Sequence, residues 1–140
     1  MTLTEFLLAC IAEDEADAQD ATPGPWWNES GTVHAPYPFG RDLTAGNGGA
    51  CHPLNAQGSN GRDADADAEH ASRHDPGRVL AECAAKRAIV ALHSSEDGVR
   101  YGYCEQCWDG NTPLPYPCLT LRILALPYAE HEQFQEEWNV

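Results

Sequence analysis

The feature that most limits how this chain can fold is a set of metal-ligating residue types in its C-terminal half. His93 ends a stretch of helical periodicity, Cys104 and Cys107 form a Cys-x-x-Cys motif, and Cys118 precedes an apolar run. Three thiolates and one imidazole are a donor set that suits a structural, tetrahedral Zn²⁺ site. The pattern therefore predicts that one zinc ion ties together a helix end, a cysteine turn and the start of the next helix.

The sequence between these ligands supports a metal crosslink. The stretch 94–117 contains many residues that interrupt helices and strands: Gly98, Gly102, Gly110, Pro113, Pro115 and Pro117. Little regular structure is expected there, so the segment needs another source of order. A structural zinc ion supplies roughly 10–16 kcal/mol of binding free energy in small zinc peptides, which is comparable with the whole stability of an ordinary domain.

The sequence leaves alternatives open at this site. Three other residues could replace His93 as the fourth ligand: Cys51, Cys83 and His131. A thioredoxin-like redox pair is the competing interpretation of the Cys-x-x-Cys motif, but that motif lies at the start of a long helix, and here Gly110 and Pro113 follow. Four protein ligands would leave no position for a substrate water, which argues against a zinc hydrolase.

The charge of the chain narrows its possible partners. The formal net charge is −14, and only eight residues are Lys or Arg. Duplex nucleic acid is bound by clustered basic residues that neutralise phosphates, so we expect no partner of that kind. An acidic surface favours solubility and could match a basic protein partner.

The N-terminal residues indicate the compartment. Residues 1–20 contain six Asp or Glu and no Lys or Arg, unlike a secretory signal. No apolar run approaches the roughly 20 residues that a transmembrane helix needs. We therefore expect a cytoplasmic protein without membrane contact, in which the thiols stay reduced and the Cys-x-x-Cys motif indicates metal rather than a disulfide.

The N-terminal half is expected to contain one helix and a few short strands. Thr2 and Glu5 have the spacing of a capping box, and apolar residues recur at three and four residues, which predicts a helix over about 4–19. Two prolines and a glycine in 21–26 end this helix. Short extended candidates follow at 26–27, 32–35, 42–44 and 50–52. Residues 57–67 have no bulky apolar side chain, which indicates a flexible loop.

The C-terminal half is expected to be helical, with helical character returning at 67–70. Asp75 and Pro76 suit an N-cap and the first helical position, which predicts a long central helix from about Pro76 to His93. The apolar run 119–126 predicts a short buried helix that ends near Pro127. Three aromatic residues then recur on a last helical segment: Tyr128, Phe134 and Trp138.

Together these patterns predict a single α+β domain over residues 1–140, stabilised by zinc. An N-terminal helix and a short antiparallel β-meander occupy 1–56, the flexible loop occupies 57–67, and a helical zinc-binding half occupies 68–140. In that half, the long central helix and the C-terminal helices surround a Cys₃His metal site.

Basic residues on and before the central helix suggest a second kind of binding site. With one tryptophan, they could line a pocket for a small anionic molecule, helped by the positive end of the helix. The candidate lining residues are Trp26, Arg73, Arg78, Lys86 and Arg87. The simpler interpretation is that these side chains pair with acidic helix faces, which is the usual role of such exposed charges.

The order of motifs along the chain carries a resemblance. The motifs are Thr-Pro-Gly-Pro-Trp at 22–26, Arg-His-Asp-Pro-Gly-Arg-Val-Leu at 73–80, Cys-Glu-Gln-Cys at 104–107, Tyr-Pro-Cys at 116–118, Ala-Leu-Pro-Tyr at 125–128 and Glu-Glu-Trp at 136–138. In this order the chain resembles a family of small uncharacterised proteins of actinobacteria (Streptomyces-like) and their phages, a domain of unknown function. The resemblance implies that His93, Cys104, Cys107 and Cys118 are recurring positions. The family continues differently after His131, which weakens a role for that residue.

The sequence favours a non-enzymatic function, because no nucleophile and base pair or carboxylate dyad can be located in it. The first hypothesis is a zinc-stabilised accessory protein of actinobacterial or phage origin that binds a host or bacterial protein. The alternative is a pocket protein that sequesters a small anionic metabolite or signalling nucleotide, as an anti-defence protein would. A metal-dependent enzyme is third.

Overall fold

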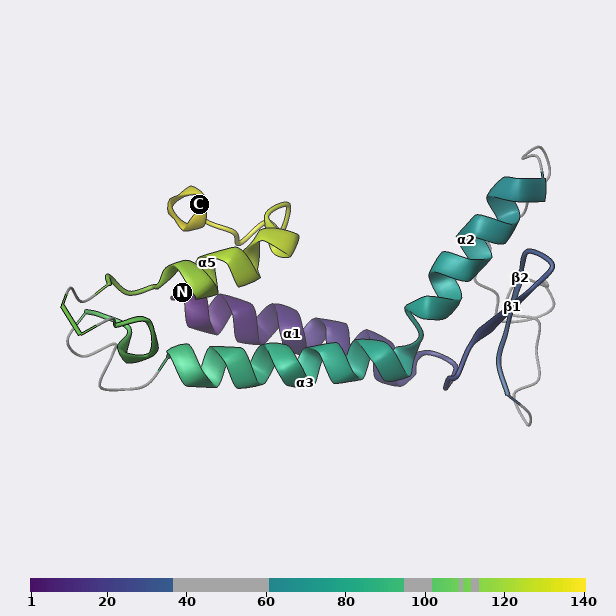
Figure 1. Ribbon diagram of the computed structural model, residues 1–140, viewed down its shortest axis with the longest axis horizontal. Coiled ribbons are helices and arrows are strands. Elements are labelled where there is room, and N and C mark those ends of the chain that lie inside the picture. The colour runs from purple at the N-terminus through teal and green to yellow at the C-terminus, as the bar shows by residue number, and fades with distance from the viewer. Residues whose placement is uncertain (37–60, 95–101, 109, 112–113) are drawn as a thin grey trace. The chain divides into compact units, whose positions relative to one another are not determined.

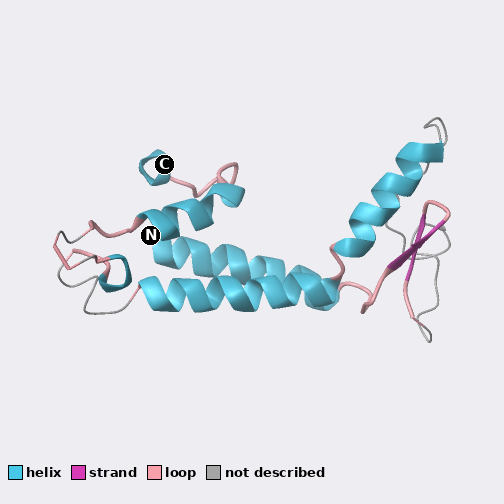
Figure 2. Ribbon diagram, viewed as in Figure 1, coloured by secondary structure: helices cyan, strands magenta, loops and turns pink. Residues whose placement is uncertain are grey.

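The fold is given by a computed structural model, which describes residues 1–36, 61–94, 102–108, 110–111 and 114–140 (Figures 1 and 2). Its elements in chain order are α1 (Leu3–Asp20), β1 (Trp27–Glu29), β2 (Thr32–His34), α2 (Gly61–Arg73), α3 (Pro76–His93), the 3₁₀ turn η1 (Glu105–Cys107), α5 (Leu119–Ala125), and the 3₁₀ turns η2 (Leu126–Tyr128) and η3 (Glu136–Trp138). The described chain thus combines helices with one two-stranded sheet. The strands predicted at 42–44 and 50–52 lie outside the described residues.

These elements form two compact units, and each is described by itself. Unit 1 consists of residues 1–14 and 82–140, and unit 2 consists of residues 15–81. The division falls within α1 and within α3, so each of these helices contributes residues to both units. The single domain expected from the sequence stays a prediction.

Helix α1 begins with the predicted capping box. The backbone N–H of Thr2 donates to Glu5 Oε2 at 2.7 Å, and the backbone N–H of Glu5 donates to Thr2 Oγ1 at 3.2 Å. These bonds lower the pKa of Glu5, because the backbone donor favours the carboxylate. The apolar side of the helix is buried in unit 1 through Leu3, Phe6, Leu7, Cys10 and Ile11. The predicted helix and its buried stripe are therefore confirmed.

Unit 2 is built from a hairpin packed on α2. Strands β1 and β2 are antiparallel, and Glu29 pairs with Thr32 across a two-residue turn. Both turn residues, Ser30 and Gly31, have positive φ, as turns that match the twist of hairpin strands require. Figure 1 shows the hairpin beside α2, and buried Val33 and Ala68 belong to these two elements.

Helix α2 corrects the sequence prediction. It begins at Gly61, so the flexible loop expected over 57–67 is wrong for 61–67, and 57–60 lie outside the described residues. The absence of bulky apolar residues was misleading, because alanine has the highest helix propensity and needs little space to pack. Ala68 is fully buried against the hairpin side of unit 2 and performs that role.

The start of α3 is organised by Asp75. Its Oδ1 accepts the backbone N–H of Arg78 at 2.8 Å, and its Oδ2 accepts the backbone N–H of Trp26 at 3.3 Å. An N-cap carboxylate is expected at this position, and Pro76 follows it as the first helical residue. The bounds predicted for the central helix, from Pro76 to His93, are confirmed.

The core of unit 1 is aromatic around Phe6. Its ring centroid lies 5.0 Å from that of Trp138, 5.9 Å from that of Phe134 and 6.4 Å from that of Tyr128. Edge-on and tilted contacts of this kind stabilise aromatic clusters beyond the burial of area alone. The aromatic residues predicted for the C-terminus therefore line the core, as expected.

The backbone that carries these rings differs from the prediction. Instead of one last helical segment, the chain forms the short 3₁₀ turns η2 and η3 after α5. Pro127 explains the change, because proline lacks the N–H that an α-helix needs to continue. Helix α5 also differs from the expected buried helix: Leu121 and Ala125 are fully buried, while Leu119 and Ile123 are exposed.

Among the described helices, none combines the length and the apolar composition that crossing a membrane requires.

Candidate metal centre

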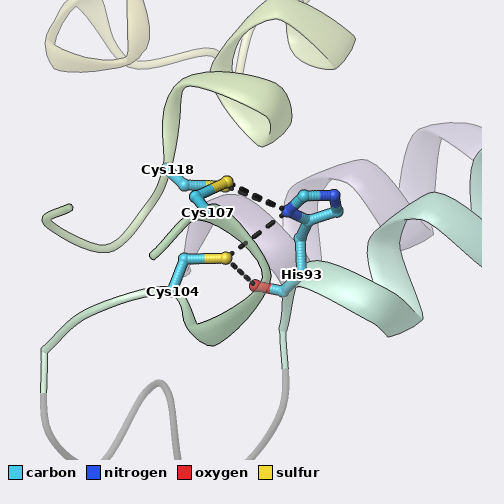
Figure 3. Close-up of side chains that lie close together, drawn as sticks. All are labelled: His93, Cys104, Cys107 and Cys118. Carbon is cyan, nitrogen blue, oxygen red and sulfur yellow. Dashed lines mark hydrogen bonds between the residues drawn. The ribbon is translucent and has the colours of Figure 1, made fainter. Parts of the chain in front are cut away.

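The four predicted ligands come from three places in unit 1. His93 is the last residue of α3, Cys104 and Cys107 flank and end the 3₁₀ turn η1, and Cys118 is the N-cap residue of α5. Each ligand thus lies at the end of a helical element, where the chain changes direction. Figure 3 shows the three sulfur atoms gathered on one side of the His93 ring.

A small backbone frame holds the Cys-x-x-Cys turn in place. The N–H of Cys104 donates to the carbonyl of Leu114 at 3.2 Å, and the N–H of Tyr116 donates to the carbonyl of Gly102 at 3.1 Å. Within the turn, the N–H of Cys107 donates to the carbonyl of Cys104 at 3.2 Å. The two chain segments that carry the cysteines are therefore paired, although most of this region has no regular structure.

A side-chain bond connects the same region to the first helix. The hydroxyl groups of Thr4 on α1 and Tyr116 share a hydrogen bond. Tyr116 lies two residues before Cys118, so this contact helps to place the third cysteine against the helical part of unit 1.

The distances between the ligand atoms match a tetrahedral metal site. His93 Nδ1 lies 3.4 Å from Cys104 Sγ, 3.4 Å from Cys107 Sγ and 3.5 Å from Cys118 Sγ (Figure 3). All four donor atoms lie within 4.8 Å of one another. In a tetrahedral zinc site the nitrogen and sulfur ligands are separated by about 3.6 Å, given metal bonds of about 2.0–2.1 Å and 2.3 Å.

Hydrogen bonding alone does not explain this arrangement. An imidazole nitrogen offers one N–H or one lone pair, so Nδ1 can make one good hydrogen bond in this direction rather than three. Three sulfur atoms at nearly equal distances from one nitrogen are instead the pattern of donors arranged around a shared cation. The group His93, Cys104, Cys107 and Cys118 could therefore hold a metal ion.

The electrostatics of the site agree with this reading. Cys104 and Cys118 are buried, and Cys107 and His93 are half-buried. Burial raises the pKa of the Cys104 thiol, and the adjacent sulfurs of Cys107 and Cys118 raise it further. Three thiolates cannot share so dry a space without a compensating positive charge, which a divalent cation would supply.

Two further groups contact the sulfur atoms. Thr120 Oγ1, in the first turn of α5, lies 3.8 Å from Cys107 Sγ. The carbonyl oxygen of His93 lies 3.7 Å from Cys104 Sγ. A hydroxyl that donates to a thiolate ligand orients it and adjusts its charge, so Thr120 is an additional member of the site. Sequence reasoning missed it, since a threonine in a helix has no distinguishing signal.

The residues considered as alternative ligands have other surroundings. His131 contacts the Phe6 ring at 5.4 Å between centroids, and its Nε2 lies 3.7 Å from a carboxylate oxygen of Glu13. Cys83 is fully buried in α3, and Cys51 lies outside the described residues. Within the described part of the chain, His93 is the residue that completes the cluster.

The candidate residues for an anionic ligand fall into both units. In unit 2, Arg73 forms an ion pair with Glu69 at 2.9 Å, and a guanidinium nitrogen of Arg78 donates to the carbonyl of Arg73 at 3.1 Å. The indole N–H of Trp26 donates to the carbonyl of Thr22 at 2.8 Å. Lys86 and Arg87 belong to unit 1, where both are half-buried.

The start of α3 bears on this second site. The backbone N–H groups of Trp26 and Arg78 both donate to the carboxylate of Asp75, at 3.3 Å and 2.8 Å. An anion bound at the helix start would need those donors, and it would meet a side chain that is already negative.

Lys86 takes part in a polar network instead. Its Nζ donates to Asp14 Oδ2 at 3.1 Å and to the Tyr128 hydroxyl at 2.7 Å, and that hydroxyl donates to Asp14 Oδ2 at 2.6 Å. Burial would lower the pKa of Lys86, but the bonds to Tyr128 and Asp14 outweigh it and raise the pKa. Burial and the bond to Asp14 raise the pKa of Tyr128 to about 12.

Comparisons with known proteins place the chain in a family. Searches of curated proteins and of solved structures found no match. A family model described as a family of unknown function, DUF6221, matches residues 1–140. The resemblance to an uncharacterised family, seen in the order of motifs, is confirmed at that level. The chain belongs to this family of unknown function, DUF6221.

Proposed function

We propose that the chain is a zinc-stabilised accessory protein that acts by binding a protein partner and does not itself catalyse a reaction. The observation that carries the proposal is the closed donor set, in which His93 Nδ1 lies 3.4–3.5 Å from all three cysteine sulfurs. Four protein ligands at these distances occupy all the corners of a tetrahedron. A substrate water would have no corner left, so the metal would serve the fold.

Zinc is the metal that best suits these donors. Three sulfur atoms and one imidazole nitrogen form a soft, tetrahedral set, which zinc accepts without a redox change. Oxygen-preferring cations such as Mg²⁺ and Ca²⁺ require carboxylates and carbonyls instead. A zinc ion would connect the end of α3, the turn η1 and the start of α5, and would thereby order the part of unit 1 that has little regular structure.

The charge of the protein supports a basic partner. The whole chain has a formal charge of −14. The described residues of unit 1 include nine Asp or Glu and three Lys or Arg. Such a surface attracts basic proteins and repels nucleic acid and anionic lipid, so a host or bacterial protein with a basic surface is the partner we propose.

The other two hypotheses have less support. A pocket for a small anionic metabolite or signalling nucleotide would use the start of α3, where Asp75 already accepts the two backbone N–H groups. A metal-dependent enzyme would need one protein ligand to leave the metal. The actinobacterial or phage origin implied by the resemblance stays a prediction.

Metal analysis of the purified full chain tests the proposal first. We expect one zinc ion per chain by elemental analysis, and X-ray absorption should give three sulfur neighbours and one nitrogen neighbour. Cys118→Ser should lose the ion, whereas Cys83→Ala, which removes a buried sulfur elsewhere in α3, should retain it. A chain without stoichiometric metal, or one whose zinc has a bound water in place of a protein ligand, would contradict the proposal.

Partner binding is tested with the same two variants. The immobilised wild-type chain should retain a basic protein at low salt and release it at high salt, and the purified protein should then bind the chain directly. Cys83→Ala should bind it equally well, and Cys118→Ser should not. A chelator-sensitive turnover of a small substrate would instead favour the enzyme hypothesis.

A further inference from the structure

Large apolar side chains are exposed next to the ligands of the metal centre. Leu92 is 58% exposed, Trp108 is 50% exposed and Leu119 is 55% exposed. Each is adjacent in sequence to a ligand: Leu92 precedes His93, Trp108 follows Cys107, and Leu119 follows Cys118. Because the ligand atoms lie within 4.8 Å of one another, the metal centre brings three exposed apolar residues from three different segments into one region of unit 1.

Helix α5 extends this apolar surface. Leu119, Ile123 and Leu126 follow one another at spacings of four and three residues, so they lie on one side of the helix. Ile123 is 52% exposed and Leu126 is 38% exposed. The opposite side of the same helix is buried through Leu121 and Ala125. The helix is therefore apolar on the side that packs in unit 1 and also on the side that faces solvent.

A surface of this kind requires an explanation. Single exposed leucines are common on soluble proteins, but a continuous stripe on one helix is typical of a binding surface. We call the group Leu92, Trp108, Leu119, Ile123 and Leu126 the apolar face. Its three α5 members have the spacing by which one helix packs against another, so a helix is the shape that fits them.

The charge around the apolar face indicates what kind of helix. The described part of unit 1 has an excess of acidic residues, nine against three basic ones. Of those three, Lys86 is bonded to Asp14 and Tyr128, and Arg122 donates from Nε to the carbonyl of Trp138 at 3.4 Å. Exposed Glu130 and Glu132 follow Leu126 closely in sequence. A second copy of this acidic chain would be repelled, and a basic segment would be attracted.

We infer that the apolar face docks a basic amphipathic helix of a partner protein, with apolar side chains against Leu119, Ile123 and Leu126 and with Lys or Arg residues toward the acidic surroundings. This inference rests on the proposed function and names the site and the partner chemistry. The metal ion assembles the face, because it joins the segments that carry Leu92, Trp108 and Leu119. Docking should therefore depend on the metal as well as on the apolar side chains.

The test uses a synthetic peptide as the probe, with the zinc-loaded full chain. The peptide has 18 residues, with leucines on one helical side and lysines on the other, and carries a fluorescent label for anisotropy. We expect it to bind the wild-type chain, and we expect Leu119→Gln/Ile123→Gln to weaken binding by roughly tenfold or more, since two anchor contacts are lost. A peptide of the same composition in scrambled order should bind much more weakly.

The matched control is Leu8→Gln. Leu8 is also an exposed leucine of unit 1, at 36%, but lies on α1 away from the apolar face in sequence. It should retain wild-type affinity. Zinc content and circular dichroism establish that each variant is folded, and Ile123→Gln alone, with a smaller expected loss, replaces the double variant if that one does not fold.

Several results would overturn the inference. One is a wild-type chain that does not bind the peptide, and another is a double variant that binds it as tightly as wild type does. Equal binding of the scrambled peptide would mean charge attraction without docking. A wild-type dimer that Leu119→Gln/Ile123→Gln converts to a monomer would mean that a second copy occupies the face. Each of these can occur with one zinc per chain, which leaves the proposed function standing, whereas absence of stoichiometric zinc contradicts the proposed function itself.

Discussion

The ammonium group of Lys86 lies 2.7 Å from the hydroxyl oxygen of Tyr128 and 5.1 Å from the centre of the same ring. The pair joins α3 to the C-terminal part of unit 1, and both residues also bond Asp14 on α1. Three segments far apart in the sequence therefore meet at one carboxylate oxygen. This network is the polar counterpart of the aromatic core around Phe6.

Replacing Lys86 with methionine should destabilise the protein. The carboxylate of Asp14 would lose its cation while it stays partly shielded from water, and the Tyr128 hydroxyl would lose a donor. We expect the free energy of unfolding to fall by about 1–2 kcal/mol, as for a partly buried charged hydrogen bond. Urea denaturation followed by circular dichroism measures this change.

The control for this prediction is Arg73→Met. Arg73 and Glu69 form an ion pair in which the side chains are 69% and 49% exposed. Pairs this exposed contribute little, so the loss should be less than about 0.5 kcal/mol. Equal effects of the two substitutions would show that the Lys86 network has no special weight.

The same network should make stability depend on alkaline pH. The pKa values of Tyr128, at about 12, and of Lys86 are both raised in the folded protein. The folded state therefore holds protons that the unfolded state releases above its ordinary values of about 10 and 10.4, so stability falls as pH rises through that range toward 12. Denaturation at successive pH values measures the slope, and Tyr128→Phe should make it shallower. A variant with an unchanged slope would contradict this assignment.

Thr120→Val should weaken metal binding without changing the fold. The substitution keeps the shape of the side chain and removes the hydroxyl that lies 3.8 Å from Cys107 Sγ. Loss of a group that supports a metal ligand typically lowers metal affinity by roughly tenfold or more. Competition with a chromophoric zinc chelator gives the affinity. Gln106→Ala, an exposed position between the two cysteines of the turn, should retain wild-type affinity; a tenfold loss there too would mean that the turn is generally sensitive.

Two glycines near Asp75 should respond oppositely to alanine. A Cβ at Gly24 would lie 2.5 Å from Asp75 Oδ2, so Gly24→Ala must displace the carboxylate that accepts the N–H groups of Trp26 and Arg78. We expect a loss of about 1–3 kcal/mol in the free energy of unfolding. Thermal and urea unfolding of the two variants side by side measure the difference.

Gly77→Ala is the matched control. A Cβ there would lie 3.5 Å from Asp75 Oδ1, an ordinary contact, and the residue is in the first turn of α3. Alanine favours the helix, so stability should rise by up to about 1 kcal/mol. A destabilising Gly77→Ala, or a neutral Gly24→Ala, would show that the cap around Asp75 tolerates movement.

The parts of this structure that sequence reasoning predicted are those with local signals. The capping box of Thr2 and Glu5 and the pair Asp75-Pro76 marked the starts of α1 and α3, because caps are formed by neighbours in the chain. The metal ligands were found for a different reason. Histidine and cysteine are chemically distinctive, so their spacing carries information that leucine or threonine does not.

The parts that were missed depend on distant contacts or on residues without such signals. The beginning of α2 at Gly61 was missed because an alanine and aspartate sequence has no apolar stripe, and burial of Ala68 against the hairpin decides its packing. The network of Lys86 joins residues 72 and 42 positions away. The exposed side of α5 was missed because an unbroken apolar run does not show which of its residues reach solvent.

The composition of unit 1 from residues 1–14 and 82–140 has a consequence for how the protein is made. On the ribosome, Phe6 emerges long before Trp138, the ring whose centroid lies 5.0 Å from its own. The apolar side of α1 must therefore wait, without its final neighbours, until translation is almost complete. Residues 15–81 can be finished in the meantime, so the first helix to be synthesised is among the last to reach its native surroundings.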